Sequence, residues 1–223
     1  MFDRLERLIG KDKLDKLKKS NILIIGLGGV GGIACETLIR NGIETITIVD
    51  NDIVEESNKN RQIIALDSTI NMNKTDAFEN RLKDINKNVK ITKITDFITK
   101  DNIDLLFKNK YDFVIDACDT VSTKILIIKK CIDINIPFIS SMGMGKKLDL
   151  SKLRIMDIKD TCYDKIAKVI RKKLKEDNIN SKVPVLSSTE KGVDTKDVIG
   201  SYSPLTNAAG LYLADYVIKE IIK

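Results

Sequence analysis

The sequence of 223 residues contains no histidine, which excludes catalysis by an imidazole base. Its four cysteines (Cys35, Cys118, Cys131 and Cys162) show no CxxC spacing, which argues against a zinc knuckle and a disulfide framework. No apolar run is long enough to cross a bilayer, and the first twenty residues carry charges throughout, unlike a signal peptide. We therefore expect a cytoplasmic protein with reduced thiols and no membrane association.

Two nucleotide-handling motifs are also missing. No GxxxxGK[ST] segment occurs, so the chain has no P-loop. No tyrosine is followed four residues later by lysine, so the catalytic pair of short-chain dehydrogenases is absent. Together with the lack of histidine, this argues against a nicotinamide-dependent dehydrogenase.

The composition that remains is that of a basic globular protein. Hydrophobic residues make up 43% of the chain, enough for a sizeable core, and the formal net charge is +6. A positive balance favours polyanionic partners. The alternative is a lysine-rich source genome, since lysine, isoleucine and asparagine are all abundant.

The order of the elements indicates a Rossmann-like, doubly wound α/β fold with a mainly parallel sheet. A helical arm is expected at 3–18. Strands are expected at 21–26, 44–50, 89–95, 112–118 and 137–140, alternating with helices at 29–41, 73–86, 101–109 and 120–134. Such alternation is typical of a parallel sheet covered by helices on both faces.

The pattern is looser after about residue 145. We expect, in order, a strand at 153–158, a basic helix at 163–177, a strand at 182–188, a mobile polar loop at 189–203 and a helix at 204–222. The prediction is one domain over 1–223. It divides into an N-terminal arm (1–20), a nucleotide-binding core (21–145) and a C-terminal substrate-side part (146–223).

A glycine cluster follows the first strand and predicts a nucleotide site. Gly26, Gly28 and Gly31 form G-x-G-x-x-G, with Gly29 inside the motif. Such glycines allow a tight turn, close approach of a phosphate and packing of the following helix. Asp50 ends the second strand, where it can accept hydrogen bonds from ribose hydroxyls. The alternative is a glycine-rich turn that serves packing alone.

A second group of polar residues follows the second strand and points to a triphosphate. It comprises Asp50, Asp52, Asn58, Arg61 and Gln62 in DNDIVEESNKNRQI, then Lys74, and Asp116 and Asp119 in DACD. The carboxyl edge of a parallel sheet is where open α/β folds bind ligands. Arginine and lysine suit phosphate oxygens, and aspartate suits Mg²⁺. The alternative is that each charge is a solvated loop residue.

These motifs resemble the ThiF/MoeB/HesA superfamily, relatives of the ubiquitin-activating enzymes, and within it the tRNA threonylcarbamoyladenosine dehydratases. The resemblance rests on GLGGVGG, NRQI, NKTDA and VIDACDTVSTK, and covers nearly the whole chain. It extends to RLIG near the start, the basic DKIAKVIRKKLK, SSTE and the AAG region of the last helix. The later stretches are the ones that separate this subfamily from the others.

The resemblance implies an activity. Such enzymes use ATP and Mg²⁺ to adenylate the threonyl carboxylate of threonylcarbamoyladenosine in tRNA. The ureido group then closes on the activated carbonyl, and AMP and pyrophosphate are released. No covalent enzyme nucleophile is needed, because the attacking group belongs to the same side chain of the substrate.

The resemblance also assigns roles to residues. Gly26, Gly28, Gly29 and Gly31 would form the nucleotide loop, with Asp50 at the ribose and Asp52, Asn58 and Gln62 nearby. Arg61 and Lys74 would meet the triphosphate, and Asp119 would bind Mg²⁺. Arg7, in ERLIG, would reach into the neighbouring subunit of a homodimer. Cysteine desulfurases of sulfur-transfer systems are possible partners by the same analogy.

Two features depart from the pattern. Met1 stands where an arginine often precedes the N-terminal phenylalanine, and VPVLS (183–187) replaces the family's DCVFS. The second change removes a cysteine and casts doubt on a thiol role there. Cys162 is the only late cysteine, and its simplest interpretation is a small buried hydrophobe.

Two other functions stay open from the sequence. One is a ThiF/MoeB-type adenylyltransferase that activates the C-terminus of a ubiquitin-like sulfur carrier, although many of these have paired CxxC motifs. The other is a catalytically silent NAD-binding or tRNA-binding module. The basic helix favours tRNA contact through its phosphates, and its cations are Lys165, Lys168, Arg171, Lys172, Lys173 and Lys175. The alternative there is a solvated face without a partner.

Overall fold

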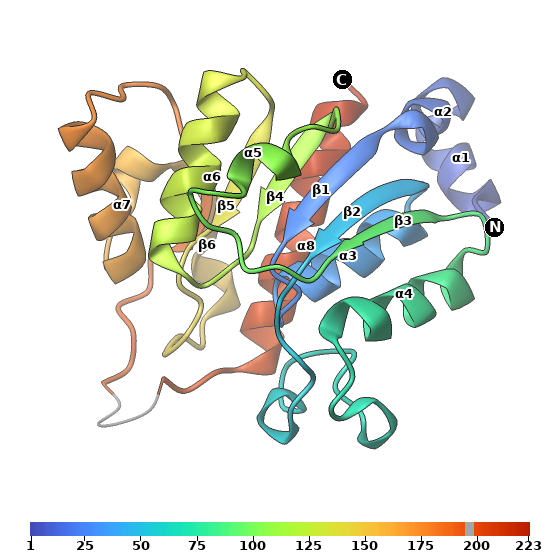
Figure 1. Ribbon diagram of the computed structural model, residues 1–223, viewed down its shortest axis with the longest axis horizontal. Helices are drawn as coiled ribbons and strands as arrows, with labels where there is room; N and C mark the ends of the chain where they lie inside the picture. The colour runs from blue at the N-terminus through green and yellow to red at the C-terminus, as the bar shows by residue number, and fades with distance from the viewer. Residues whose placement is uncertain (195–198) are drawn as a thin grey trace.

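A computed structural model describes residues 1–194 and 199–223. Within these ranges the strands form a seven-stranded sheet in the order β3-β2-β1-β4-β5-β7-β6 (Figure 1). All neighbours are parallel except β6, which runs antiparallel to β7 at one edge. The strands are β1 (Asn21–Ile25), β2 (Thr45–Val49), β3 (Lys90–Ile94), β4 (Phe113–Asp116), β5 (Phe138–Ser141), β6 (Leu153–Asp157) and β7 (Pro184–Ser188). The predicted doubly wound, mainly parallel α/β fold is confirmed.

Helices cover both faces of the sheet (Figure 1). They are α1 (Asp3–Ile9), α2 (Lys11–Lys19), α3 (Gly31–Arg40), α4 (Lys74–Ile85), α5 (Ile103–Leu106), α6 (Val121–Asp133), α7 (Lys165–Glu176) and α8 (Ser203–Ile221). Short 3₁₀ turns lie at Glu56–Asn58, Asp67–Thr69, Leu150–Lys152 and Ile158–Asp160. None of the described helices is long and apolar enough to cross a membrane.

Alternate residues of each strand supply two separate cores. Ile22 and Ile24 of β1 pack with α3, α4 and α8 on one face, whereas Leu23 and Ile25 pack with α5, α6 and α7 on the other. This is the period of two expected for a strand buried on both faces, and it explains why the central strands read as continuous apolar runs. β3 at the edge is largely exposed, in keeping with its two lysines and one threonine among five residues.

The N-terminal arm differs from the expected single helix over 3–18. It is broken at Gly10, whose φ of 86° and ψ of 159° fall in a region that only glycine adopts readily. α2 packs into the core through Leu14 and Leu17, but α1 has no buried residue. The arm lies at the end of the sheet where β1 begins, and α1 contacts the core through its partly buried last residue, Ile9 (Figure 1).

The other boundaries agree with the sequence within a few residues, apart from the helix expected at 101–109. α5 contains four residues there, because the apolar pattern around Leu105 and Leu106 is too short for a longer amphipathic face. In the loop expected at 189–203, residues 195–198 lie outside the described residues, and the described remainder up to Tyr202 has no helix or strand. The C-terminal part contributes β6 and β7 to the sheet and α8 to the face beside α3.

Candidate active site

The glycine loop begins where β1 ends and is shaped by two close backbone approaches. A Cβ atom at Gly26 would lie 2.6 Å from the backbone oxygen of Ala117, and its φ is 89°. A Cβ at Gly31, the first residue of α3, would lie 1.9 Å from the oxygen of Gly26. Only glycine fits either position. These two residues therefore set the turn from strand to helix that the motif predicts.

The outer side of the same loop is open. A Cβ at Gly28 would meet nothing closer than Nε2 of Gln62, at 3.9 Å. Gln62 is buried, yet its Oε1 has no hydrogen-bond partner. An accessible backbone beside an unsatisfied buried oxygen suits a bound polar ligand, because buried polar atoms are seldom left unpaired. Gly29 is covered instead, by the side chains of Arg61 and Thr206.

Asp50 joins the glycine loop to the end of β2. Its Oδ2 accepts a hydrogen bond from the backbone N–H of Leu27 at 2.6 Å, and its Oδ1 accepts one from the N–H of Asp52 at 2.9 Å. Burial raises the pKa of this carboxyl, and the Lys74 ammonium 3.8 Å away acts in the opposite direction. Each carboxylate oxygen keeps a second lone pair for an additional donor, such as a ribose hydroxyl.

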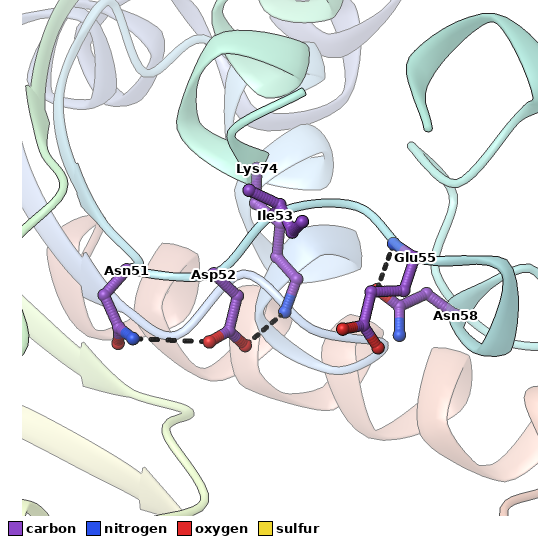
Figure 2. Close-up of a pocket in the computed structure, with 6 residues that line it drawn as sticks. All are labelled: Asn51, Asp52, Ile53, Glu55, Asn58 and Lys74. Carbon is purple, nitrogen blue, oxygen red and sulfur yellow. Dashed lines mark hydrogen bonds and ion pairs between the residues drawn. The ribbon is translucent and has the colours of Figure 1, made fainter. Parts of the chain in front are cut away.

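Lys74 and Asp52 lie side by side in the wall of a cleft of about 340 Å³ (Figure 2). Asp52 is 61% exposed at its side chain, whereas Lys74, the first residue of α4, is buried. Their Nζ and Oδ2 atoms are 2.7 Å apart. The cleft is lined by Asn51, Asp52, Ile53, Glu55, Asn58 and Lys74. A buried ammonium whose nearest counter-ion is exposed to solvent can exchange that carboxylate for a phosphate.

The segment between β2 and α4 holds the remaining predicted residues. The Oδ1 of buried Asn58 accepts a hydrogen bond from the backbone N–H of Glu55 and closes a 3₁₀ turn. Arg61 donates from one guanidinium nitrogen to the oxygen of Ser57 at 3.0 Å and to Oδ1 of Asn60 at 2.9 Å. The guanidinium is thus held by neutral acceptors, and its charge is available to an anion, while the backbone oxygen and Cγ of Arg61 lie against Gly29.

Asp116 lies apart from these residues. The prediction from DACD that its carboxylate would join the polar cluster at the nucleotide site is therefore wrong. Its carboxylate is fully buried, 3.1 Å from the ammonium of Lys124 and hydrogen-bonded to the hydroxyl of Ser140. Burial and this carboxylate raise the pKa of the Cys118 thiol well above its usual range. Lys124 and Ser140 were missed from the sequence. The one available signal was the spacing of eight residues between Asp116 and Lys124, which places Lys124 on α6, the helix that follows β4.

Asp119 lies at the carboxyl edge of the sheet, after β4, and is exposed. Its only polar contact among the described residues is a long hydrogen bond of 3.4 Å from the hydroxyl of Thr120. The structure therefore places it on the same edge as the cleft but does not join it to the other site residues. Arg7 is exposed on α1, and this helix lies beside the start of β1, at the opposite end of that strand from the glycine loop (Figure 1).

The start of α8 is a second feature that sequence reasoning missed. Thr206 approaches Gly29, Asn60 donates to the backbone oxygen of Ser201 just before the helix, and the buried Oδ1 of Asn207 lacks a partner. The last helix therefore forms one wall beside the glycine loop. Its sequence signal, SPLTNAAG, consists of small residues that allow close packing, and a Cβ at Gly210 would lie 2.5 Å from the oxygen of Val30.

Comparison with known proteins identifies the family. The model of the ThiF family matches residues 2–223. The chain belongs to the ThiF family. The tRNA threonylcarbamoyladenosine dehydratase of Bacillus subtilis (strain 168) is 37% identical over 240 residues, which cover 100% of this chain and 94% of that protein. The resemblance found in the sequence motifs is confirmed.

A solved relative shows the same ThiF fold over nearly its whole length. The crystal structure of the Escherichia coli tRNA N6-threonylcarbamoyladenosine dehydratase, TcdA, in complex with ATP superimposes with a TM-score of 0.94. It is 32% identical and covers 99% of this chain and 93% of its own. By contrast, the adenylyltransferase and sulfurtransferase UBA4 of Vanderwaltozyma polyspora is 35% identical over 148 residues, 66% of this chain and 34% of that protein.

Proposed function

We propose that this ThiF-family chain is an ATP-dependent tRNA threonylcarbamoyladenosine dehydratase. The observation that carries the proposal is the full-length similarity to curated dehydratases and to a dehydratase structure that contains ATP. The open backbone at Gly28 and the unpaired oxygen of Gln62 fit a nucleotide on independent grounds. In the proposed reaction, the threonyl carboxylate displaces pyrophosphate from ATP, and the ureido group then displaces AMP.

Two cations of the site would act on the triphosphate. Lys74 exchanges the exposed Asp52 carboxylate for a phosphate oxygen and, being buried, cannot follow that carboxylate into solvent. Arg61, whose guanidinium is held by neutral acceptors, supplies a second positive charge to the triphosphate. Cations fixed in this way stabilise the charge that grows on the pyrophosphate leaving group. Asp50 orders the loop and accepts the ribose hydroxyls.

Mg²⁺ fits the site only as a shared ion. Among the described residues, no group of three or more acidic or thiol side chains could hold a metal by itself. Mg²⁺ is commonly held by one or two carboxylates together with substrate phosphates and water. Asp119 is exposed and without an ion pair among the described residues, so it is the residue we assign to the metal, which would neutralise triphosphate charge.

A homodimer completes the proposed site. α1 has no fully buried residue, and although its Ile9 packs against the core of its own subunit, Leu8 is 81% exposed. The exposed side of α1 is therefore the surface that a second copy would cover. α1, which carries Arg7, lies at the end of the sheet where β1 begins, whereas the glycine loop follows the other end of β1 (Figure 1). Docked on a second copy, the same arm would present a guanidinium to the partner's ATP, where a bidentate contact to phosphate is favourable.

The second candidate is an adenylyltransferase for a ubiquitin-like protein. It is favoured by the shared sequence with the UBA4 protein, but that similarity covers 34% of the larger enzyme. No CxxC pair occurs in the sequence either, and Cys162 is half-buried beside α7. The dehydratase explains the whole chain, including the basic helix, and is the function we adopt.

The test compares substrates for AMP release. The protein is incubated with ATP and Mg²⁺ and either tRNA that carries threonylcarbamoyladenosine, the same tRNA without it, or a ubiquitin-like sulfur carrier. We expect AMP with the modified tRNA alone, together with loss of one water from the nucleoside. Equal release with unmodified tRNA, or release that depends on the sulfur carrier, would reject the assignment.

A further inference from the structure

Tyr163 is an exposed aromatic residue held in an unfavourable backbone conformation. Its side chain is 66% exposed, and its φ is +54°, in the left-handed region. For a bulky residue that is not glycine, such a conformation costs on the order of 1–3 kcal/mol and persists only when its surroundings enforce it. The side chain is therefore exposed to solvent and leaves the chain from a constrained backbone position.

The next residue is what fixes it. Both carboxylate oxygens of buried Asp164 accept backbone hydrogen bonds of 2.9 Å, one from Ala167 in the first turn of α7 and one from Gly143. The ammonium of Lys147, also buried, lies 3.3 Å away. Helix α7 and the turn that presents Tyr163 are thereby attached to the loop after β5.

This attachment places Tyr163 at the edge of the sheet that carries the nucleotide site. Gly143 follows the carboxyl end of β5, and in the sheet order β2, β1, β4 and β5 are consecutive. Three strand spacings of about 4.8 Å separate the ends of β2 and β5 by about 14 Å. Asp119, after β4, lies between them. A nucleotide bound at the glycine loop and a macromolecule touching Tyr163 can therefore meet over this edge.

A row of lysines leads from Tyr163 along α7. The lysine row consists of Lys165, Lys168, Lys172 and Lys175, spaced by three, four and three residues and therefore on one face of the helix. All four are exposed, while Ala167, Ile170 and Leu174 face the core. At 1.5 Å per residue the row is about 15 Å long.

Few carboxylates of the protein itself are paired with these four lysines. In the described part of the chain, Lys165, Lys168 and Lys175 form no ion pair, and Lys172 is 3.8 Å from Glu176. The other two cations of the basic helix already bind groups of the protein. Arg171 donates to the backbone oxygens of Ile158 and Thr161, and Lys173 pairs with Asp177 at 3.3 Å.

We propose that Tyr163 stacks on an unpaired base of the tRNA substrate and that the lysine row binds the phosphates beside that base. The inference rests on the proposed function, since it names the surface on which the substrate of that site lies. Single-stranded RNA loops are typically bound by aromatic stacking combined with a basic track, because each base has a π-face and each nucleotide a charge.

The test compares Tyr163→Ala with Tyr163→Phe, which keeps the ring and the same backbone restriction. The dissociation constant for modified tRNA should rise about 5- to 100-fold for the alanine variant, the range found for loss of one stacked base, and stay within about twofold for the phenylalanine variant. The dissociation constant for ATP should not change in either. Equal tRNA affinity of the alanine variant and the wild type would overturn the proposal.

A spectroscopic readout separates stacking from a structural role. An anticodon stem-loop is prepared with 2-aminopurine in place of each base next to the modified adenosine in turn. Quenching of one of these probes on binding, retained in Tyr163→Phe and lost in Tyr163→Ala, is the expected result. Quenching that survives in the alanine variant at every position would refute stacking by this residue.

The lysine row is tested by salt dependence against a matched control. Alanine at Lys165, Lys168 and Lys172 should lower the slope of log affinity against log salt by about 2, at about 0.7 for each single-strand phosphate. Lys173→Ala, on the same helix but paired with Asp177, should leave the slope unchanged. An equal fall of the slope in both variants would contradict binding of phosphates by the lysine row.

The outcomes for the wild type and the variants distinguish the two proposals. Wild-type protein that neither binds nor converts modified tRNA would reject the proposed function. Wild-type turnover together with variants that bind tRNA normally would reject this inference alone.

Discussion

At the scale of single residues, a substitution at Gly28 should change ATP binding without changing the stability of the fold. A methyl group at this position meets no atom within 3.9 Å, so Gly28→Ala should fold with an unchanged free energy of unfolding. It would nevertheless occupy the space we assign to a phosphate, and the dissociation constant for ATP should rise at least about tenfold, or 1.4 kcal/mol. Isothermal titration calorimetry and urea denaturation measure the two quantities.

The neighbouring glycine provides the contrast. Gly31→Ala would bring Cβ within 1.9 Å of the backbone of Gly26 and should prevent folding altogether. If Gly28→Ala bound ATP as tightly as the wild type, no phosphate would lie over this part of the loop.

Arg61, Lys74 and Asp119 are expected to act in catalysis rather than in nucleotide capture. If their charges meet charge that develops on the phosphates, alanine at Arg61 or Lys74 should lower kcat by roughly 10²–10³. ATP affinity should fall much less. Single-turnover measurements of AMP formation, with ATP binding measured separately, distinguish the two effects.

Asp119 is tested through the metal. Asp119→Asn keeps the size of the side chain and removes its charge, so it should require more Mg²⁺ for half-maximal activity. A variant that is as active as the wild type at low Mg²⁺ would remove Asp119 from the metal site.

At the scale of elements, the sequence predicted the unit of β1, glycine loop and α3 better than it predicted the arm or the interior. The strand, the glycine motif and the acid after β2 are local signals, and the structure brings Gly28, Asp50 and Lys74 to one edge. The role of Asp116 could not be predicted from its neighbours in the sequence. In DACD one aspartate points into the core and another into solvent, and only the buried partner Lys124, on a different element, decides which.

The arm was mispredicted because a change of phase in its apolar pattern was overlooked. Leu5 and Leu8 share one helical face, whereas Leu14 and Leu17 share another that lies almost opposite, since Leu14 follows Leu5 by nine residues. The backbone turns at Gly10, with φ 86° and ψ 159°, so that two short helices replace one. α2 packs on the core beside α8 through Leu14 and Leu17, whereas α1 contacts the core through its partly buried last residue, Ile9.

The break at Gly10 has a testable consequence. Gly10→Ala has free space around its Cβ, but the backbone would be strained by about 1–3 kcal/mol unless the arm changes direction. We expect weaker dimerisation and lower kcat with the core intact, measured by sedimentation equilibrium and by AMP release. Gly200→Ala, also in open space but with an ordinary φ, is the control. Identical behaviour of the two variants would show that the direction of the arm does not matter.

At the scale of the whole molecule, the account requires a two-fold dimer with shared sites. Arg7→Ala and Asp119→Ala, each expected to be nearly inactive, are unfolded and refolded together in equal amounts. About half of the dimers are then mixed, and in each mixed dimer one site carries both defects and the other carries neither. Activity should return to roughly a quarter of the wild-type level under two-fold symmetry. If Arg7 acts within its own chain, every site keeps a defect and no activity returns, provided that subunit exchange is verified with differently tagged chains.

The central claim is that the threonyl carboxylate attacks the α-phosphorus of ATP, and an oxygen label follows that event directly. Modified tRNA is prepared with ¹⁸O in both oxygens of the threonyl carboxylate and converted by the enzyme in unlabelled water. The acyl-adenylate route places one labelled oxygen on the α-phosphorus, and that oxygen leaves with AMP when the ureido group closes on the carbonyl. Mass spectrometry should therefore find one ¹⁸O in AMP and none in pyrophosphate. Unlabelled AMP, or label in inorganic phosphate with formation of ADP, would contradict the account.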